Sequence, residues 1–208
     1  MIVVVGGHSR NIGKTAVMEG VLRALPDLGW NAVKVTQHGH GRCSADGTDC
    51  GCADAGRHPY ALSEAQEPSL TDTGRYLAAG AQRSFWLRTR QGELAEGMPS
   101  LRRILEMGKP ALIESNSVLN YLVPDVYIAV LDFAVDDMKD SARRFLDRAD
   151  AFVVLHGDRP IPWQGVPERW LTAKPIFTTH APHYAPAALT GWLRTRLLNG
   201  HREVAAQG

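Results

Sequence analysis

The 208-residue sequence lacks any apolar run that approaches the roughly 20 residues needed to span a bilayer. It also lacks a basic leader that runs into a small-residue cleavage site, which argues against a signal peptide. Its formal net charge is only +1, which argues against the broad positive surface used to bind DNA or RNA. These absences predict a soluble, cytoplasmic protein that acts on neither membranes nor nucleic acids.

Cysteine is scarce as well. The chain has 3 cysteines, too few for a disulfide framework in a protein of this length. All of them fall within residues 43–52, in a region rich in histidine, glycine and aspartate. In a reducing compartment they are free thiols, metal ligands or reactive groups.

Short apolar runs alternate with amphipathic patterns along the rest of the chain. Because the apolar runs are continuous, they are typical of strands covered on both faces, as in a parallel sheet. The alternation predicts a single three-layer α/β domain over residues 1–208, with a mainly parallel sheet flanked by helices. The expected strands are 2–5, 32–37, 84–89, 110–115, 126–132, 151–156 and 175–179. The expected helices are about 14–25, 72–81, 93–107, 138–148 and 184–198.

The stretch GGHSRNIGKTAV, residues 6–17, follows the first apolar run. A glycine-lysine-threonine sequence between a buried strand and a helix is typical of a phosphate-binding loop of the P-loop NTPase type. In such a loop, backbone N–H groups and the positive end of the next helix surround the anion. Lys14 would then reach the terminal phosphates, and the Thr15 hydroxyl would bind Mg²⁺. The candidate nucleotide-binding residues are His8, Ser9, Arg10, Asn11, Ile12, Gly13, Lys14, Thr15 and Ala16.

His8 occupies the position where the usual loop has glycine. Gly6 and Gly7 precede it and could adopt backbone conformations that a side chain forbids. His8 itself is either a surface histidine or, when protonated, a phosphate contact.

Three carboxylates are candidates for the rest of the site. Glu114 ends the apolar strand at 110–113, where ligands gather in open α/β sheets, and could hold magnesium or polarise an attacking group. Asp72 either contacts metal or nucleotide, or caps a helix that begins at Thr73. Asp158 is either a contact to the nucleotide base or a turn residue before Pro160.

Beyond the phosphate loop, two segments have a recognisable pattern, with Lys34, Gln37, His38 and His40 in one and Asp72, Thr73, Arg75, Ala79, Gly80 and Ala81 in the other. In these residues the sequence resembles the MobB family of GTP-binding accessory proteins in molybdopterin guanine dinucleotide synthesis. The resemblance covers roughly the first half of the chain and implies a P-loop fold related to the dethiobiotin synthetase and metallochaperone GTPase group. It departs from the family where Ser115 and Asn116, not glycine, follow Glu114.

Residues 38–71 form an expected insert rich in cysteine and histidine, without a convincing strand or helix up to residue 70. Thiolate and imidazole groups are ligands that Zn²⁺ favours, and an iron–sulfur cluster is an alternative. The candidate ligands are Cys43, Cys50 and Cys52, with His38 or His40 as the fourth. Alternatively, the histidines serve the nucleotide and the cysteines are free.

Together these patterns predict binding and slow hydrolysis of a Mg²⁺-bound nucleoside triphosphate, GTP or ATP, with Lys14, Glu114 and Asp72 as the catalytic candidates. The MobB resemblance implies an accessory role in molybdenum cofactor biosynthesis, with a cofactor-synthesis protein as partner. Hydrolysis would be slow unless the partner, or a second subunit as in a homodimer, supplied a missing cationic group to the phosphates. Alternatives are a small-molecule kinase or ATP-dependent ligase, and a nucleotide-switched metal-delivery protein. Four arginines either meet an anionic substrate or form a solvated face: Arg75, Arg83, Arg88 and Arg90.

Overall fold

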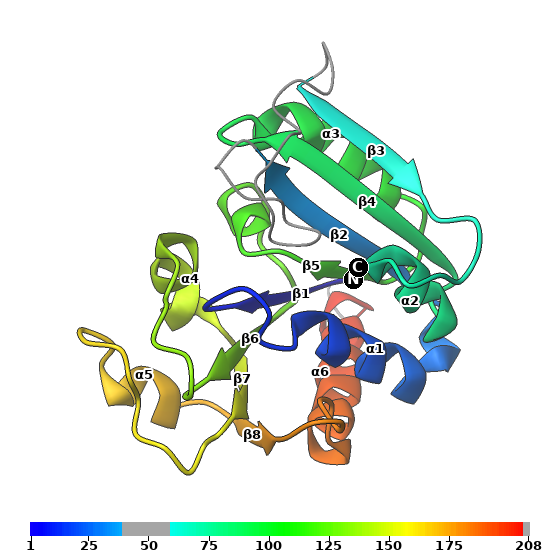
Figure 1. Ribbon diagram of the computed structural model, residues 1–208. Helices are drawn as coiled ribbons and strands as arrows, with labels where there is room; N and C mark the ends of the chain where they lie inside the picture. The colour runs from blue at the N-terminus through cyan, green and yellow to red at the C-terminus, as the bar shows by residue number, and fades with distance from the viewer. Residues whose placement is uncertain (39–58, 206–208) are drawn as a thin grey trace.

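The computed structural model describes residues 1–38 and 59–205, which form a sheet with helices on both faces (Figure 1). The sheet has eight strands in the order β3-β4-β2-β5-β1-β6-β7-β8. Neighbouring strands are parallel except for the pair of β3 and β4 at one edge. The strands are β1 (Ile2–Gly7), β2 (Asn31–His38), β3 (Tyr60–Glu64), β4 (Arg83–Arg90), β5 (Ala111–Glu114), β6 (Val126–Asp132), β7 (Ala151–Leu155) and β8 (Ile176–Thr179).

The helices divide between the two faces of the sheet. Buried residues of α1, α2 and α6 belong to one hydrophobic cluster, and those of α3, α4 and α5 belong to the other. The helices are α1 (Lys14–Ala24), α2 (Asp72–Ala78), α3 (Leu94–Leu105), α4 (Asp140–Phe145), α5 (Glu168–Thr172) and α6 (Ala187–Ala205). Short 3₁₀ helices are η1 (Pro26–Leu28), η3 (Ser117–Asn120) and η4 (Leu146–Arg148).

The central strand shows why the apolar runs are continuous. Val4 of β1 packs into one cluster, while Val3 and Val5 pack into the other, and all three are fully buried. A strand covered on both faces needs apolar side chains at every position. The structure therefore confirms the predicted three-layer α/β fold with a mainly parallel sheet.

The expectation of a structureless segment from residue 38 to 70 is wrong in part. Tyr60–Glu64 forms β3, which pairs antiparallel with β4 at the edge of the sheet. Its central residues are exposed, so the strand has no buried apolar face that its sequence could reveal. The short helix α5 was also not expected. His38 is the last residue of β2, whereas His40, Cys43, Cys50 and Cys52 lie outside the described residues.

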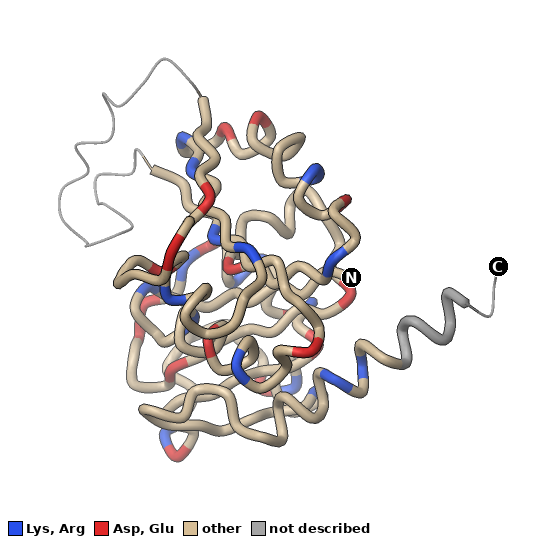
Figure 2. Tube along the Cα trace, turned by 90° about the vertical axis from the view of Figure 1, so that its right-hand side faces the viewer, with Lys and Arg blue, Asp and Glu red and all other residues tan. Residues whose placement is uncertain are grey.

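Charges of both signs are mixed along the described trace (Figure 2), in keeping with the small net charge. Among the described residues, no helix combines the length and the apolar character required to cross a membrane.

Candidate functional site

The loop between β1 and α1 forms the candidate phosphate site, at the carboxyl end of the central strand. Asn11 and Gly13 have left-handed backbone conformations, with φ of 55° and 87°. Gly13 is the N-cap of α1, and a Cβ at this position would lie 2.6 Å from Cε1 of Tyr184. Gly13 is therefore required both by its φ and by the ring of Tyr184 beside it.

Gly6 and Gly7 have a different role from the one expected. Both belong to β1, and the reason for glycine at these positions is lack of space. A Cβ on Gly6 would overlap the side chain of Asn116, and one on Gly7 would lie 2.9 Å from Cδ of Lys14. These glycines thus let the Lys14 stem and the Asn116 amide lie directly on the strand.

The interpretation of His8 as a surface histidine is wrong, because its ring lies in the interior and both ring nitrogens have backbone partners. His8 is 0% exposed, and its ring centroid lies 4.4 Å from that of Trp163, with the two ring planes tilted by 50°. The Asp132 backbone N–H donates to Nε2 at 3.0 Å, so Nδ1 carries the proton and donates to the Asp137 carbonyl at 2.7 Å. Burial lowers the pKa of His8, which keeps the ring neutral. Its backbone N–H is also occupied, by the Val130 carbonyl.

The start of the loop is fastened to the segment that follows β6. The buried Ser9 hydroxyl donates to the Asp137 carboxylate, and the backbone N–H of Lys139 donates to the His8 carbonyl at 2.8 Å. Together with the His8 ring, these bonds fix the first half of the loop to residues 137–139. The same loop buries Ile12 in the core and leaves Arg10 and Asn11 exposed.

Lys14 lies inside the loop. Its Nζ donates to the Ser9 carbonyl at 2.6 Å, so the ammonium group folds back onto the loop. Burial lowers its pKa, and the charges of Lys34 and Arg10 act in the same direction, while that of Glu114 opposes them. Lys14 is thus a partly desolvated cation with other cations around it, an arrangement that favours an incoming anion.

The carboxylate of Glu114 is the acidic centre of the site. It is 7% exposed, and its Oε2 accepts from the Thr15 hydroxyl at 2.9 Å and from the Tyr76 hydroxyl. Burial raises the pKa of Tyr76 well above its ordinary value, so the phenol keeps its proton and donates. The end of β5 therefore meets the start of α1 and the middle of α2 at one carboxylate.

Asp72 belongs to the same site and does not cap α2. Thr71 is the N-cap, and its hydroxyl accepts from the Gly74 backbone N–H at 3.2 Å. The Asp72 carboxylate pairs with Lys34, whose Nζ also lies 3.7 Å from Glu114. Lys34 therefore joins the two carboxylates through a single ammonium group.

Thr15, Glu114 and Asp72 fit a magnesium site by the chemistry of their donors. All three offer oxygen, the ligand atom that Mg²⁺ prefers, and two of them already share a hydrogen bond. Within residues 1–38 and 59–205, no group of three or more His, Cys, Asp or Glu side chains is placed to hold a metal by itself. A magnesium ion here would depend on nucleotide phosphates and water for its remaining ligands, as is usual for this ion.

Asn116 lies two residues after Glu114, next to Ser115, which stands where the resemblance to MobB proteins implied a glycine. Its side-chain amide accepts from the Gly7 N–H and donates to the Gly7 carbonyl, both at 2.8 Å. The end of β5 therefore fixes the end of β1 by two bonds. Sequence reasoning missed this function, and also missed Tyr76, Asp137 and Lys139, because nothing local to these residues indicates their contacts with the loop.

The remaining candidate carboxylate, Asp158, lies in a different turn. Asp158 is exposed in the turn after β7, where Arg159 N–H bonds to the His156 carbonyl. Near it, His156 Nδ1 lies 2.7 Å from Oδ1 of Asp132 at the end of β6.

The arginines proposed as a substrate contact are distributed among separate local interactions. Arg75 pairs with Glu19 of α1 at 2.5 Å, and Arg88 lies over the Trp86 ring at 4.6 Å. Arg83 forms a two-bond pair with Glu64, at 2.6 and 2.7 Å. These side chains do not converge on one anion site.

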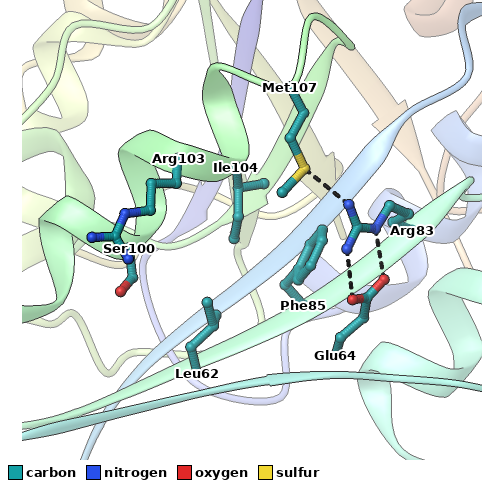
Figure 3. Close-up of a pocket in the computed structure, with 8 residues that line it drawn as sticks. All are labelled: Leu62, Glu64, Arg83, Phe85, Ser100, Arg103, Ile104 and Met107. Carbon is teal, nitrogen blue, oxygen red and sulfur yellow. Dashed lines mark hydrogen bonds and ion pairs between the residues drawn. The ribbon is translucent and has the colours of Figure 1, made fainter.

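An open pocket of about 300 Å³ lies between β3, β4 and α3 (Figure 3). The Arg83–Glu64 pair forms one wall, and the Met107 sulfur contacts the same guanidinium (Figure 3). Arg83 is the first residue of β4, so this pocket lies at the amino ends of the parallel strands, which we call the amino edge of the sheet. The phosphate loop lies at their carboxyl ends, the carboxyl edge. Its lining residues are Leu62, Glu64, Arg83, Phe85, Ser100, Arg103, Ile104 and Met107.

No protein-family model and no curated protein sequence matches the chain. Among solved structures, it is similar to LpxK from Aquifex aeolicus in complex with ATP, with a TM-score of 0.46 and 17% identity, covering 85% of this chain and 53% of that one. The chain thus spans about half the length of LpxK. It is also similar to HypB from Helicobacter pylori in complex with nickel, with a TM-score of 0.49 and 14% identity, covering 97% of this chain and 87% of that one. ATP and nickel are ligands of those proteins; for this chain, the fold follows from its own sheet order and phosphate loop.

Proposed function

We propose that the chain binds a magnesium-bound nucleoside triphosphate at residues 9–16 and hydrolyses it slowly. The observation that carries this proposal is the meeting of three groups at the start of α1. Gly13 opens the helix with a left-handed φ, Lys14 presents a partly desolvated ammonium group, and Thr15 is hydrogen-bonded to Glu114. Helix N-termini bind anions because their N–H groups are unpaired and the helix dipole is positive there.

In this proposal Lys14 exchanges the Ser9 carbonyl for the oxygens of the terminal phosphates. A neutral carbonyl is a weaker partner for an ammonium group than an anionic oxygen, so the exchange is favourable. Thr15, Glu114 and Asp72 would hold magnesium, which would supply charge neutralisation on the phosphates. Lys34, which now joins the two carboxylates, would then be free to share its charge with the nucleotide.

The more specific part of the proposal is a GTP-dependent accessory role of the MobB type. Its support is that Lys34 and Asp72, matched in separate segments of the resemblance, form an ion pair beside the phosphate loop. Asp158 would accept hydrogen bonds from the guanine N1–H and exocyclic amine, since its exposed turn follows β7 at the carboxyl edge of the sheet.

The test is nucleotide binding by Lys14→Ala in the full chain, measured by calorimetry with GTP and ATP in the presence of Mg²⁺. We expect at least a hundredfold loss of affinity with an unchanged circular dichroism spectrum. Lys109→Ala is the matched control, because Lys109 is exposed and precedes β5 at the opposite edge of the sheet. Wild-type affinity in Lys14→Ala would overturn the proposed function.

A further inference from the structure

Lys139 is a cation at the phosphate loop that the sequence analysis did not select. The spacing of apolar residues predicted a helix over 138–148, which would have made Lys139 an ordinary surface position. Instead α4 begins at Asp140, and Lys139 is in the segment fastened to the start of the loop. Its backbone N–H bonds to the His8 carbonyl, and two residues earlier Asp137 accepts from Ser9 and His8.

The surroundings of the Lys139 ammonium group are unusual for a lysine near the surface. Burial lowers the pKa of Lys139 to about 8, and the positive charges of Lys14 and Arg10 contribute in the same direction. The opposing acids, Asp137 and Glu114, have smaller effects. Among the described residues, no ion pair or hydrogen bond of its ammonium group is formed.

An arrangement of this kind is unfavourable in the absence of a ligand. The positive charges of Lys14 and Arg10 oppose that of Lys139, and like charges held near one another repel. Structural lysines avoid that cost by extending into water or pairing with a carboxylate. Convergence of cations around a concave loop is instead typical of a site built for an anion with several charges.

We propose that Lys139 contacts the terminal phosphoryl group of the bound nucleoside triphosphate, as a second phosphate-binding lysine opposite Lys14. The inference depends on the proposed nucleotide site and deepens it. The backbone of Lys139 is attached at the beginning of the loop, and its charge interacts with those of Lys14 and Glu114. Lys139 therefore supplies in cis the cationic group that slow P-loop hydrolases otherwise take from a partner.

The experiment compares Lys139→Met and Lys139→Arg with Lys14→Met and the control Lys109→Met. Affinities for GTP, GDP, ATP and ADP are measured at pH 7.0 with Mg²⁺. One charge-assisted hydrogen bond corresponds to roughly a tenfold to hundredfold change in affinity. We expect a loss of that size for Lys139→Met with triphosphates, and little change with diphosphates. Lys139→Arg restores most of the affinity, since its charge is retained.

The pH profile separates a phosphate contact from a structural role. In the wild type, Lys139 loses its proton as the pH rises through about 8, so triphosphate affinity falls between roughly pH 8 and 9.5. Lys139→Arg removes this decline, because arginine stays charged over the whole range. Lys14 is present in both proteins, so any titration of its own is common to them.

The outcomes distinguish the two proposals. If Lys139→Met binds triphosphate like the wild type while Lys14→Met does not, the inference is wrong and the nucleotide site stands. Equal losses for di- and triphosphates, or failure of Lys139→Arg to restore binding, would also overturn the inference. If the wild type binds neither GTP nor ATP, the proposed function itself is wrong.

Discussion

The two edges of the sheet differ in how their charges are used. At the amino edge, Arg83 and Glu64 satisfy each other through two hydrogen bonds beside an open pocket. At the carboxyl edge, the charge of Lys14 interacts with those of Lys34 and Lys139, and Glu114 and Asp72 already have donor partners. A pair of opposite charges that are mutually satisfied leaves little affinity for a ligand. An excess of positive charge that the fold holds in place favours binding of an anion.

The difference shows that neither a pocket nor a set of arginines is sufficient to indicate a candidate functional site. The pocket in Figure 3 contains polar and apolar groups, but the charges of Arg83 and Glu64 neutralise each other. At the phosphate loop, by contrast, the charge of Lys14 is opposed by other positive charges. Substitutions at the carboxyl edge should therefore have larger effects than equivalent ones at the amino edge.

The largest effect on stability is expected for Lys34→Met. This change leaves the Asp72 and Glu114 carboxylates without the ammonium group that joins them, and the Glu114 side chain is 9% exposed. Breaking a buried ion pair in this way costs about 3 kcal/mol in the free energy of unfolding. Urea denaturation without Mg²⁺ measures the loss, and added Mg²⁺ should recover part of it. A change no larger than that of Lys109→Met would contradict this account of the site.

Gly13→Ala is expected to have the next largest effect on stability. The left-handed φ of 87° costs a side chain about 2 kcal/mol, and the added methyl group also meets the Tyr184 ring. Gly108→Ala is the matched control, because Gly108 has a φ of 73° and nothing within 4 Å of the new Cβ. We expect Gly13→Ala to be the more destabilising of the two and to weaken nucleotide binding, which Gly108→Ala should leave intact.

His8→Gln should have a smaller and pH-dependent effect. At pH 7.5 the lost hydrogen bonds cost about 1 kcal/mol. Because burial lowers the pKa of His8 below 6.5, the unfolded wild type binds a proton more readily than the folded one. Wild-type stability is then complete above pH 6.5 and falls as the pH drops toward the lowered pKa.

The variant lacks this titration, so the gap between the two proteins should narrow from pH 7.5 to pH 5.5 in urea denaturation. His183→Gln serves as the control, because His183 is exposed. A gap that stays constant over this range would mean that His8 titrates as it does in the unfolded chain.

The smallest effect is expected for Arg83→Met at the amino edge. Arg83 and Glu64 are exposed by 42% and 31%, and ion pairs in water contribute little to stability. Nucleotide affinity should be unchanged and the urea midpoint nearly so. A loss of nucleotide binding in this variant would remove the contrast between the two edges.

The sequence was sufficient to predict the parallel strands and the strand–loop–helix at the start of the chain. These features depend on local patterns: a buried strand such as β6 is apolar at nearly every position, and Lys14 and Thr15 are recognised from their neighbours. Edge strand β3 escaped prediction because its residues face solvent and have no pattern. The functions of Asn116, Tyr76 and Lys139 depend on contacts between distant segments, which are set by the order of strands in the sheet.

His8 shows the same limit within the loop itself. In sequence it looks like a substitution for glycine in a rim that faces the ligand. In the structure it belongs to the interior, because both ring nitrogens and the ring face have partners from β6 and beyond. Only the location of these partners decides which way the side chain points.

The burial of His8 has a practical consequence for engineering. A designer who stabilises proteins by restoring the most frequent residue at each position would replace His8 with glycine. Here that replacement would empty the space beside Trp163. It would also leave the Asp137 carbonyl and the Asp132 N–H without their His8 partners. In this molecule the common residue would be the damaging one.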